Sequence, residues 1–260
     1  MADWNPNLYT RFEDERTRPA AELLARVGLG SPKLAIDIGC GPGNSTELVA
    51  RRYPEAEIVG LDTSPAMLGT ARRRLPAARF VEGDAATWQP DRAPDLIYAN
   101  ASLQWVPDHP ALLPRLFALL APGGVLAVQM PDNLAEPTHH LMRSIAAQGP
   151  WAAAIGDPAI AGRVGRMLSV DAYYDLLASS AAEVDVWRTA YQHPMKDAGA
   201  IVDWVSATGL KPFIDPLSPD LKAGFLDTYG RAIDAAYATR SDGRRLLAFP
   251  RLFIVARKAA

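Results

Sequence analysis

The chain has 260 residues, of which 49% are hydrophobic, so it can bury the core of one large α/β domain. Its 27 basic and 29 acidic residues give a net charge of −2, and this balance provides no general positive field that would attract nucleic acid or an anionic membrane. The only cysteine, Cys40, excludes an intramolecular disulfide, and the four histidines form no zinc pattern with it, so no metal is expected.

The N-terminal segment, residues 1–16, is polar and charged. It lacks the basic and then apolar layout of a secretion signal, and no apolar run in the chain approaches the ~20 residues that span a bilayer. We therefore expect a cytoplasmic protein without a membrane partner. Trp4, Tyr9 and Phe12 are candidates for a lid that excludes water from a site, with core packing as the alternative.

Strand-like and helix-like segments alternate from residue 17 to about 130. Residues 17–29 form an amphipathic helix, and residues 63–75 form the best-marked later helix, in which Ser64 caps and Pro65 takes the first helical position. Five short β-rich runs, each followed by a polar or glycine-bearing turn, are found at 34–39, 57–62, 79–84, 94–100 and 124–130. This alternation predicts parallel βαβ units.

The alternation stops after Met130. Residues 132–182 are mainly helix and loop, 183–191 form a strand, 197–240 are helical again, and 246–258 form a last strand. We predict a single α/β domain over residues 1–260, with a seven-stranded Rossmann-like sheet and a core of about 17–131, 183–192 and 246–258. The insertions at about 132–182 and 197–240 would form a helical cap near the carboxyl ends of the strands, where open α/β sheets bind their ligands.

A glycine-rich loop, "IDIGCGPGNST" at residues 36–46, follows the first strand. The dinucleotide fingerprint G-x-G-x-x-G would place its third glycine at Asn44, which argues against a nicotinamide cofactor. The tighter spacing of Gly39, Gly41 and Gly43 after Asp37 resembles that of class I S-adenosylmethionine-dependent methyltransferases. The glycines would then admit the amino-acid and ribose portions of S-adenosylmethionine against bare backbone, and Asp37 would accept backbone N–H groups of the loop.

Acidic residues end the second and third strands. Asp62 is placed to accept both ribose hydroxyls, Asp84 to accept from the adenine amino group, and Ala85 to offer its backbone N–H. The alternative is that both acids simply cap the next helices. The other residues that we expect to bind the cofactor at this edge are Thr63, Ser64, Met67, Asn100, Ala101 and Ser102.

Longer strings resemble the bacterial trans-aconitate 2-methyltransferases, and they span both ends of the chain. They include "DWNPNLY", "ERTRP", "NASLQWVPDH", "VLAVQMPDN", "EPTHHLMR", "DWVSATGLKPF" and "LLAFPRLFIVAR". Residues of about 144–169 and 214–240 resemble the family least. The resemblance implies transfer of a methyl group from S-adenosylmethionine to one carboxylate of trans-aconitate, which gives the monomethyl ester and S-adenosylhomocysteine.

A carboxylate acceptor is already ionised at pH 7, so the enzyme needs no general base and must position and desolvate the acid. Arg16, Arg18 and Arg251, with His139 or His140, are candidates to hold its carboxylates. Arg16 or Arg18 could instead hold the methionine carboxylate of the cofactor or lie on a solvated helix face, and strand alternation could turn Arg251 outward. We expect the arginines to hold the two carboxylates that do not react.

Weaker donors should face the carboxylate that reacts. Trp105, Gln129 and Tyr174 are candidates for that wall, with core packing as the alternative. Tyr173 and Tyr174 are neighbours on one helix, so only one of them can face inward.

Two other functions remain open from the sequence. A methyltransferase acting on another small acceptor, such as a phenol, would need a general base, for which His109, His139, His140 and His193 are the candidates. A non-catalytic protein could also bind S-adenosylmethionine as a sensor and regulate a partner.

Overall fold

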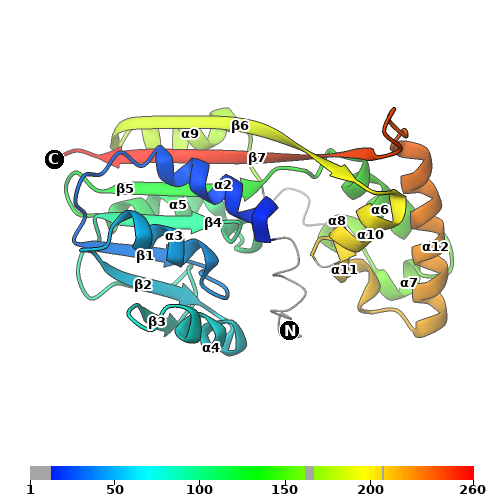
Figure 1. Cartoon of the computed structure of the whole chain (residues 1–260), viewed down its shortest axis with the longest axis horizontal. Coiled ribbons are helices and arrows are strands. Elements are labelled where there is room, and N and C mark those ends of the chain that lie inside the picture. Colours follow the sequence, from blue (N-terminus) through cyan, green and yellow to red (C-terminus); the bar gives the residue numbers. More distant parts are fainter. Residues whose placement is uncertain (1–12, 162–166, 207) are drawn as a thin grey trace. The chain divides into compact units, whose positions relative to one another are not determined.

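The computed structural model describes residues 13–161, 167–206 and 208–260, with side chains from residue 17 onward (Figure 1). Within these residues, seven strands form one sheet in the order β3-β2-β1-β4-β5-β7-β6. The strands are β1 (Leu34–Ile38), β2 (Glu57–Asp62), β3 (Arg79–Glu82), β4 (Leu96–Asn100), β5 (Val125–Pro131), β6 (Ala181–Met195) and β7 (Arg245–Lys258). The first five strands are parallel, and β7 runs antiparallel to β5. The predicted seven-stranded α/β fold is therefore confirmed.

Helices connect the strands. They are α2 (Glu13–Ala25), α3 (Asn44–Arg52), α4 (Pro65–Arg74), η1 (Leu103–Trp105), α5 (His109–Ala118), α6 (Pro137–Ala146), α7 (Ala152–Ile155), α8 (Pro158–Ala161), α9 (Val170–Ala178), α10 (Ala198–Ser206), α11 (Lys211–Ile214) and α12 (Pro219–Ala236). At α4, the Ser64 side chain accepts a hydrogen bond from the Met67 N–H, and Pro65 takes the first turn, as predicted. None of the described helices is both long and apolar enough to cross a membrane.

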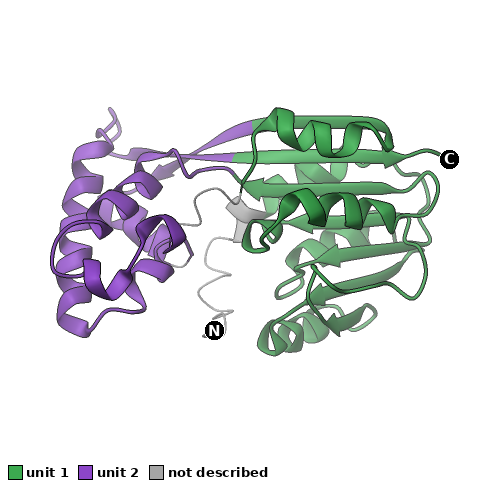
Figure 2. Ribbon diagram, turned by 180° about the vertical axis from the view of Figure 1, so that it is seen from behind, with its two compact units in different colours: residues 1–131, 166–188, 251–260 green, residues 132–165, 189–250 purple. Residues whose placement is uncertain are grey.

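The chain divides into two compact units (Figure 2). The first contains Met1–Pro131, Arg166–Arg188 and Arg251–Ala260, and the second contains Asp132–Gly165 and Thr189–Pro250. The predicted end of the first core segment at residue 131 coincides with the first boundary. Helix α9 lies in the first unit, whereas the sequence placed it in the helical insertion of about 132–182. The reason is its packing against α5, where the buried Tyr173 bonds to His109.

The centre of the sheet forms the core of the first unit. Strands β1, β4 and β5 are buried along almost their whole length, as expected for parallel strands with helices on both faces. Helix α2 is tied to this core by Tyr98, whose buried hydroxyl donates to the Ala20 carbonyl at 2.6 Å. Burial also raises the pKa of Tyr98, so this hydroxyl keeps its proton and remains a donor.

The second unit has a helical core of its own. Helices α6, α10 and α12 pack together, and the buried Tyr229 hydroxyl of α12 donates to the Thr138 carbonyl of α6 at 3.1 Å. Trp151 meets Phe225 edge to face, with 5.3 Å between the ring centroids. This unit therefore has its own apolar interior, as a separately folded body requires.

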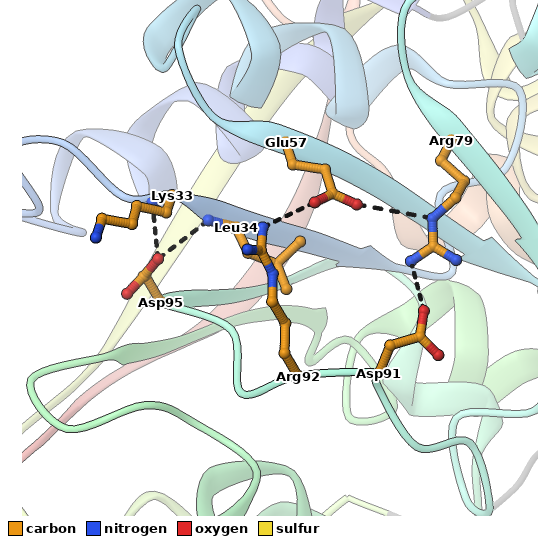
Figure 3. A network of polar contacts seen from close by, with 7 residues as sticks. All are labelled: Lys33, Leu34, Glu57, Arg79, Asp91, Arg92 and Asp95. Carbon is orange, nitrogen blue, oxygen red and sulfur yellow. Dashed lines mark hydrogen bonds and ion pairs between the residues drawn. The ribbon is translucent and has the colours of Figure 1, made fainter.

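Polar contacts tie the amino ends of the strands together (Figure 3). One oxygen of Asp95 accepts from the N–H groups of Lys33 and Leu34 at 2.7 and 3.0 Å, at the start of β1. Glu57, at the start of β2, pairs with Arg92 at 2.8 Å. These contacts stabilise the edge of the sheet opposite the carboxyl ends, and they leave the carboxyl ends free to build a ligand site.

Candidate cofactor and acceptor site

A cavity lies at the carboxyl ends of β1, β2 and β4, where the strand order reverses between β1 and β4. Open α/β sheets bind ligands at such a switch point. The lining residues are Ile38, Gly39, Gly41, Pro42, Leu61, Asp62, Thr63, Met67, Gly83, Asp84, Ala85, Ala101, Ser102, Leu103, Trp105 and Val106. Most of the residues predicted to bind the cofactor are thus brought together. Asp37, Gly43, Ser64 and Asn100 are outside this set, although Asn100 lines a smaller hollow on the other side of the glycine loop.

The three glycines of the loop are needed for different structural reasons. All three adopt positive φ angles, of 70°, 54° and 92° for Gly39, Gly41 and Gly43. A β-carbon at Gly39 would overlap the Ser102 side chain, and one at Gly43 would press on Ala71 of α4. A β-carbon at Gly41 would meet nothing within 4 Å. Gly41 is therefore the position where bare backbone leaves room for a ligand, whereas Gly39 and Gly43 are required by packing within the protein.

Asp62 ends β2 and orders the floor of the cavity. Its Oδ2 accepts from the Gly41 N–H at 2.8 Å, and its Oδ1 accepts from the Ser64 N–H at 2.9 Å. Each carboxylate oxygen has about two lone-pair sites, so each retains capacity for one more donor from the cavity. Asp62 thus stabilises the next turn and also offers acceptors to a ligand, which combines the two roles that the sequence left as alternatives.

Asp37 is buried in β1, but its predicted partners were wrong. Its Oδ2 accepts from the hydroxyls of Ser45 and Thr46, both at 2.7 Å, instead of from backbone N–H groups of the loop. Burial raises the pKa of Asp37 to about 6, with Asp62 adding to the rise and the two hydroxyl bonds opposing it. Among the described residues, its Oδ1 finds no hydrogen-bond donor. Asp37 therefore anchors the first turn of α3 under the glycine loop.

The turn after β3 presents Asp84 and Ala85 to the cavity. The Asp84 side chain accepts from the Ala86 N–H at 2.8 Å, and its carbonyl accepts from the N–H groups of Thr87 and Trp88. Ala85 is buried, with its N–H left for a ligand as far as the described residues show. This turn offers one donor beside one carboxylate acceptor, which is the complement of the N1 and amino edge of adenine.

The turn after β4 forms the opposite wall. Ala101 has a φ of 52°, which is unusual for a residue with a side chain and marks a conformation held in place by its surroundings. Its N–H donates to the Gln129 carbonyl at 2.8 Å, and its carbonyl accepts from Gln104 at 2.8 Å. Ser102 donates to the Ile38 carbonyl at 2.7 Å, and Trp105 lines the cavity. The wall is therefore held by bonds to β1 and β5.

A polar row continues from this wall across three strands. Asn100 ends β4, Gln129 lies opposite it on β5, and Arg251 lies on β7 across from the end of β5. Arg251 is only 4% exposed and donates from Nη1 to the Gln129 side-chain oxygen at 3.4 Å. The Asn100 Oδ1 and the Gln129 Nε2 are buried without a hydrogen-bond partner among the described residues. The alternative that Arg251 turns outward is thus wrong.

The N-terminal candidates give a mixed result. Tyr9, together with Trp4 and Phe12, lies outside the described residues, as does the side chain of Arg16. Arg18 is on the exposed face of α2, with a side chain 69% exposed, and it pairs with Glu22 at 2.8 Å. This is the solvated helix face that the sequence left as an alternative for Arg18.

Of the neighbouring tyrosines, Tyr173 faces inward and Tyr174 is 49% exposed. Successive helical residues point about 100° apart, so the burial of one turns the other toward solvent. Tyr174 is therefore the outward-facing member of the pair, and neither tyrosine lines the cavity. Tyr173 instead bonds to His109, which is buried and also contacts the Leu103 carbonyl at 2.9 Å.

The remaining histidines belong to the second unit. His139 is half-buried on α6 beside Gly209, with its Nδ1 3.0 Å from the Thr138 hydroxyl, and His140 is exposed. His139 is thus the more buried of the pair. The His193 ring lies beside the Trp204 ring, with 4.9 Å between ring centroids and an angle of 31° between the ring planes. A role of His139 in binding the acid stays a prediction.

The sequence did not identify four aliphatic residues that line the cavity, Ile38, Leu61, Leu103 and Val106. Ile38 and Leu61 are the last buried positions of β1 and β2, and Leu103 and Val106 follow β4. These residues could have been found from the sequence because they are close in the chain to Gly39, Asp62 and Ser102. Residues that flank the end of a strand lie at the same edge of the sheet. Among the described residues, no cluster of three or more potential metal ligands is found.

These residues fit S-adenosylmethionine. The open space beside Gly41 suits a bulky ligand without phosphates, and Asp62 has free acceptor capacity for ribose hydroxyls. Asp84 and Ala85 complement adenine, while Leu61 and Met67 supply apolar surface to the same cavity.

Comparison with known proteins agrees with this geometry. Residues 12–212 match the family model of a methyltransferase domain. The chain is similar to proteins named trans-aconitate 2-methyltransferase from Methylobacterium radiotolerans, with 77% identity and 100% of both chains covered, and from Paracidovorax citrulli, with 65% identity and 100% of both chains covered. The protein of that name from Yersinia pestis is 57% identical, with 98% of each chain covered.

Two solved structures share the fold. The YcgJ protein from Bacillus subtilis has a TM-score of 0.58 at 14% identity, with 94% of this chain and 99% of that chain covered. Phosphoethanolamine N-methyltransferase 2 from Haemonchus contortus, in complex with S-adenosyl-L-methionine, has a TM-score of 0.56 at 16% identity, with 94% of this chain and 53% of that chain covered. At this identity they bear on the fold alone. The curated relatives, similar over their whole length, and the matching domain show that the chain belongs to the trans-aconitate 2-methyltransferase family.

Proposed function

We propose that this protein transfers the methyl group of S-adenosylmethionine to one carboxylate of trans-aconitate, in the cytoplasm. The full-length relatives with this name and the cavity at the switch point of the sheet support the proposal. When bound, S-adenosylmethionine supplies a methyl group on a sulfonium, and the products are the acid monomethyl ester and S-adenosylhomocysteine.

The cofactor is held by the ends of three strands. Gly41 leaves backbone open to the amino-acid and ribose portions, Asp62 accepts from the ribose hydroxyls, and Asp84 with Ala85 binds the adenine edge. The existing bonds of Asp62 to Gly41 and Ser64 support this assignment, because they fix the carboxylate before a ligand arrives. A site fixed in this way loses little conformational entropy when it binds.

The observation that carries the acceptor assignment is the burial of Arg251. A guanidinium that is 4% exposed, next to an amide and at the same edge of the sheet as the cavity wall, is a strong site for a carboxylate. We assign Arg251 to a carboxylate of the acid that does not react, because a strong cation on the attacking oxygen would lower its nucleophilicity. The Gln129 Nε2 is a weaker donor for the same acid.

The reaction needs no general base from this chain. A carboxylate with an ordinary pKa near 4 is ionised at neutral pH, so binding, orientation and exclusion of water are the tasks of the protein. His109, the only histidine of the first unit, is occupied by Tyr173 and Leu103, which disfavours a role as base for a hydroxyl acceptor. Trp105 lines the cavity and is assigned to the wall beside the reacting carboxylate.

A methylation assay tests the proposal. The protein and S-adenosylmethionine are incubated with trans-aconitate, cis-aconitate, citrate, isocitrate and a panel of phenols, and the release of S-adenosylhomocysteine is measured. We expect the highest kcat/KM with trans-aconitate, an ester located by NMR, and no turnover of phenols. Faster turnover of a phenol would overturn the assignment of the acceptor. Tight binding of S-adenosylhomocysteine without turnover of any acid would indicate a sensor.

A further inference from the structure

Helix α5, which comes later in the chain, holds the turn that would face adenine. Arg115, in the last turn of α5, donates from Nη1 to the Trp88 carbonyl at 3.0 Å and from Nη2 to the Ala85 carbonyl. The two carbonyls flank the turn after β3. One planar guanidinium therefore fixes the separation and orientation of both, which a single point charge such as lysine cannot do.

Helix α5 is a rigid support for this contact. Its other face is anchored in the core by Leu112, Leu113, Leu116 and Phe117, all of which are buried. Arg115 itself is half-buried, and among the described residues no carboxylate pairs with it. Its hydrogen bonds in the described chain therefore go to this turn.

The bonds constrain the groups that a base would meet. The Ala85 N–H shares its peptide plane with the Asp84 carbonyl, which the Thr87 and Trp88 N–H groups hold, and Arg115 holds the next peptide through the Ala85 carbonyl. The Asp84 carboxylate is held by the Ala86 N–H, and the Asp84 carbonyl accepts from Trp88, whose own carbonyl is the second acceptor for Arg115. A donor and an acceptor are thus presented to the cavity in a fixed relation.

We propose that Arg115 is a positioning residue for base recognition: it holds the Ala85 N–H and the Asp84 carboxylate where they distinguish adenine from bases with the opposite hydrogen-bonding edge. The inference rests on the proposed function, because it takes the cavity as an S-adenosylmethionine site. Arg115 does not touch the base and acts only through the turn.

Calorimetry with two ligands tests the role. S-adenosylhomocysteine carries the adenine edge, and S-inosylhomocysteine carries an oxygen in place of the amino group and a donor at N1. A site built to bond one edge rejects the other strongly, so we expect the native protein to prefer S-adenosylhomocysteine by at least about 30-fold. In Arg115→Met this preference should fall below about 3-fold, mainly because S-adenosylhomocysteine binds more weakly.

The controls separate positioning from folding. Arg115→Lys retains one donor and should keep an intermediate preference, and it serves as the readout if Arg115→Met does not fold. Arg92→Met removes an exposed arginine whose pair with Glu57 lies at the opposite edge of the sheet, and it should leave the preference unchanged. If Arg115→Met lowers the affinity for both ligands by the same factor, the positioning role is overturned. Failure of the native protein to bind S-adenosylhomocysteine would instead overturn the proposed function.

Discussion

His109 and Tyr173 are joined by a hydrogen bond of 2.6 Å between the ring Nδ1 and the phenol oxygen. The His109 Nε2 lies 2.9 Å from the Leu103 carbonyl, which can only accept, so in the neutral ring Nε2 carries the hydrogen and Nδ1 accepts from Tyr173. The phenol oxygen in turn accepts from the Leu168 N–H at 3.2 Å. The chain of bonds links α9 to Leu103, which lines the cavity.

Tyr173→Phe should weaken this link without changing the shape of the core. The substitution removes the partner of the buried His109 Nδ1 and of the partly buried Leu168 N–H, so we expect a loss of about 1–3 kcal/mol in the free energy of unfolding. The affinity for S-adenosylhomocysteine should fall a few-fold as Leu103 becomes less constrained. Urea unfolding and calorimetry measure the two effects. Tyr174→Phe, at the exposed neighbour, should change neither, and an equal effect of both substitutions would contradict the account.

Local patterns predicted the fold and the main positions of the site because both depend on short-range chemistry. Ser64 and Pro65 mark the start of α4 through backbone capping, which acts within one turn. Asp62 and Asp84 could be placed in one site because parallel strands bring their carboxyl ends to one edge of the sheet. The glycine spacing argued against a dinucleotide loop, and the family resemblance supplied the acceptor.

Contacts between distant elements could not be predicted in the same way. The partners of Asp37 are hydroxyls on the following helix, and no local rule distinguishes them from the N–H groups of the loop. The periodicity of α9 indicated that one of two tyrosines faces inward, but its phase depends on packing against α5. Arg115 carries no motif, because its role depends on two carbonyls about 30 residues earlier in the chain.

The glycine loop allows folding and cofactor binding to be separated. Gly41→Ala should fold, although an L-residue at positive φ costs about 1–2 kcal/mol of stability. The variant should bind S-adenosylhomocysteine at least about 10-fold more weakly, because the new methyl group occupies open ligand space. Gly39→Ala should lose more stability, because the methyl group also overlaps Ser102. Calorimetry and thermal unfolding distinguish the two.

Gly123→Ala is the matched control for the glycine prediction. Gly123 also has a positive φ, 74°, and a β-carbon there would meet nothing within 4 Å, but it does not line the cavity. It should show the backbone cost and full affinity for S-adenosylhomocysteine. If Gly41→Ala binds as tightly as Gly123→Ala, the open space beside Gly41 is not part of the ligand site.

Asp37 should make stability fall as the pH rises. Its pKa is about 6 in the folded protein and has an ordinary value of 3.8, so between these values the folded state holds a proton that the unfolded state has lost. The contribution is fully present below pH 3.8 and is lost as the pH rises through 6. The lost stability is roughly 3 kcal/mol.

The difference in unfolding free energy between the native protein and Asp37→Asn isolates this effect, because the other ionisable groups largely cancel. We expect the difference to move in favour of Asp37→Asn between pH 4 and pH 7. Thr46→Val removes a hydroxyl that lowers the pKa of Asp37, so it should shift the fall in stability to higher pH. A difference that does not vary over this range would show that Asp37 is already ionised at pH 4.

Arg251 provides the sharpest comparison between the sequence and the structure, because the sequence named both Arg18 and Arg251 as ligands for the acid and favoured Arg18. Arg251→Met should raise the KM for trans-aconitate by about 10- to 150-fold, the range expected for a hydrogen bond to a charged group. Its affinity for S-adenosylhomocysteine should stay within about 2-fold of the native value, since Arg251 does not line the cofactor cavity.

Arg18→Met breaks an exposed pair with Glu22 and should change KM by less than about 2-fold. Steady-state kinetics at saturating S-adenosylmethionine measure both variants. If Arg18→Met raises KM and Arg251→Met does not, the acid is bound by α2, and the buried guanidinium of β7 serves only the packing of the sheet edge.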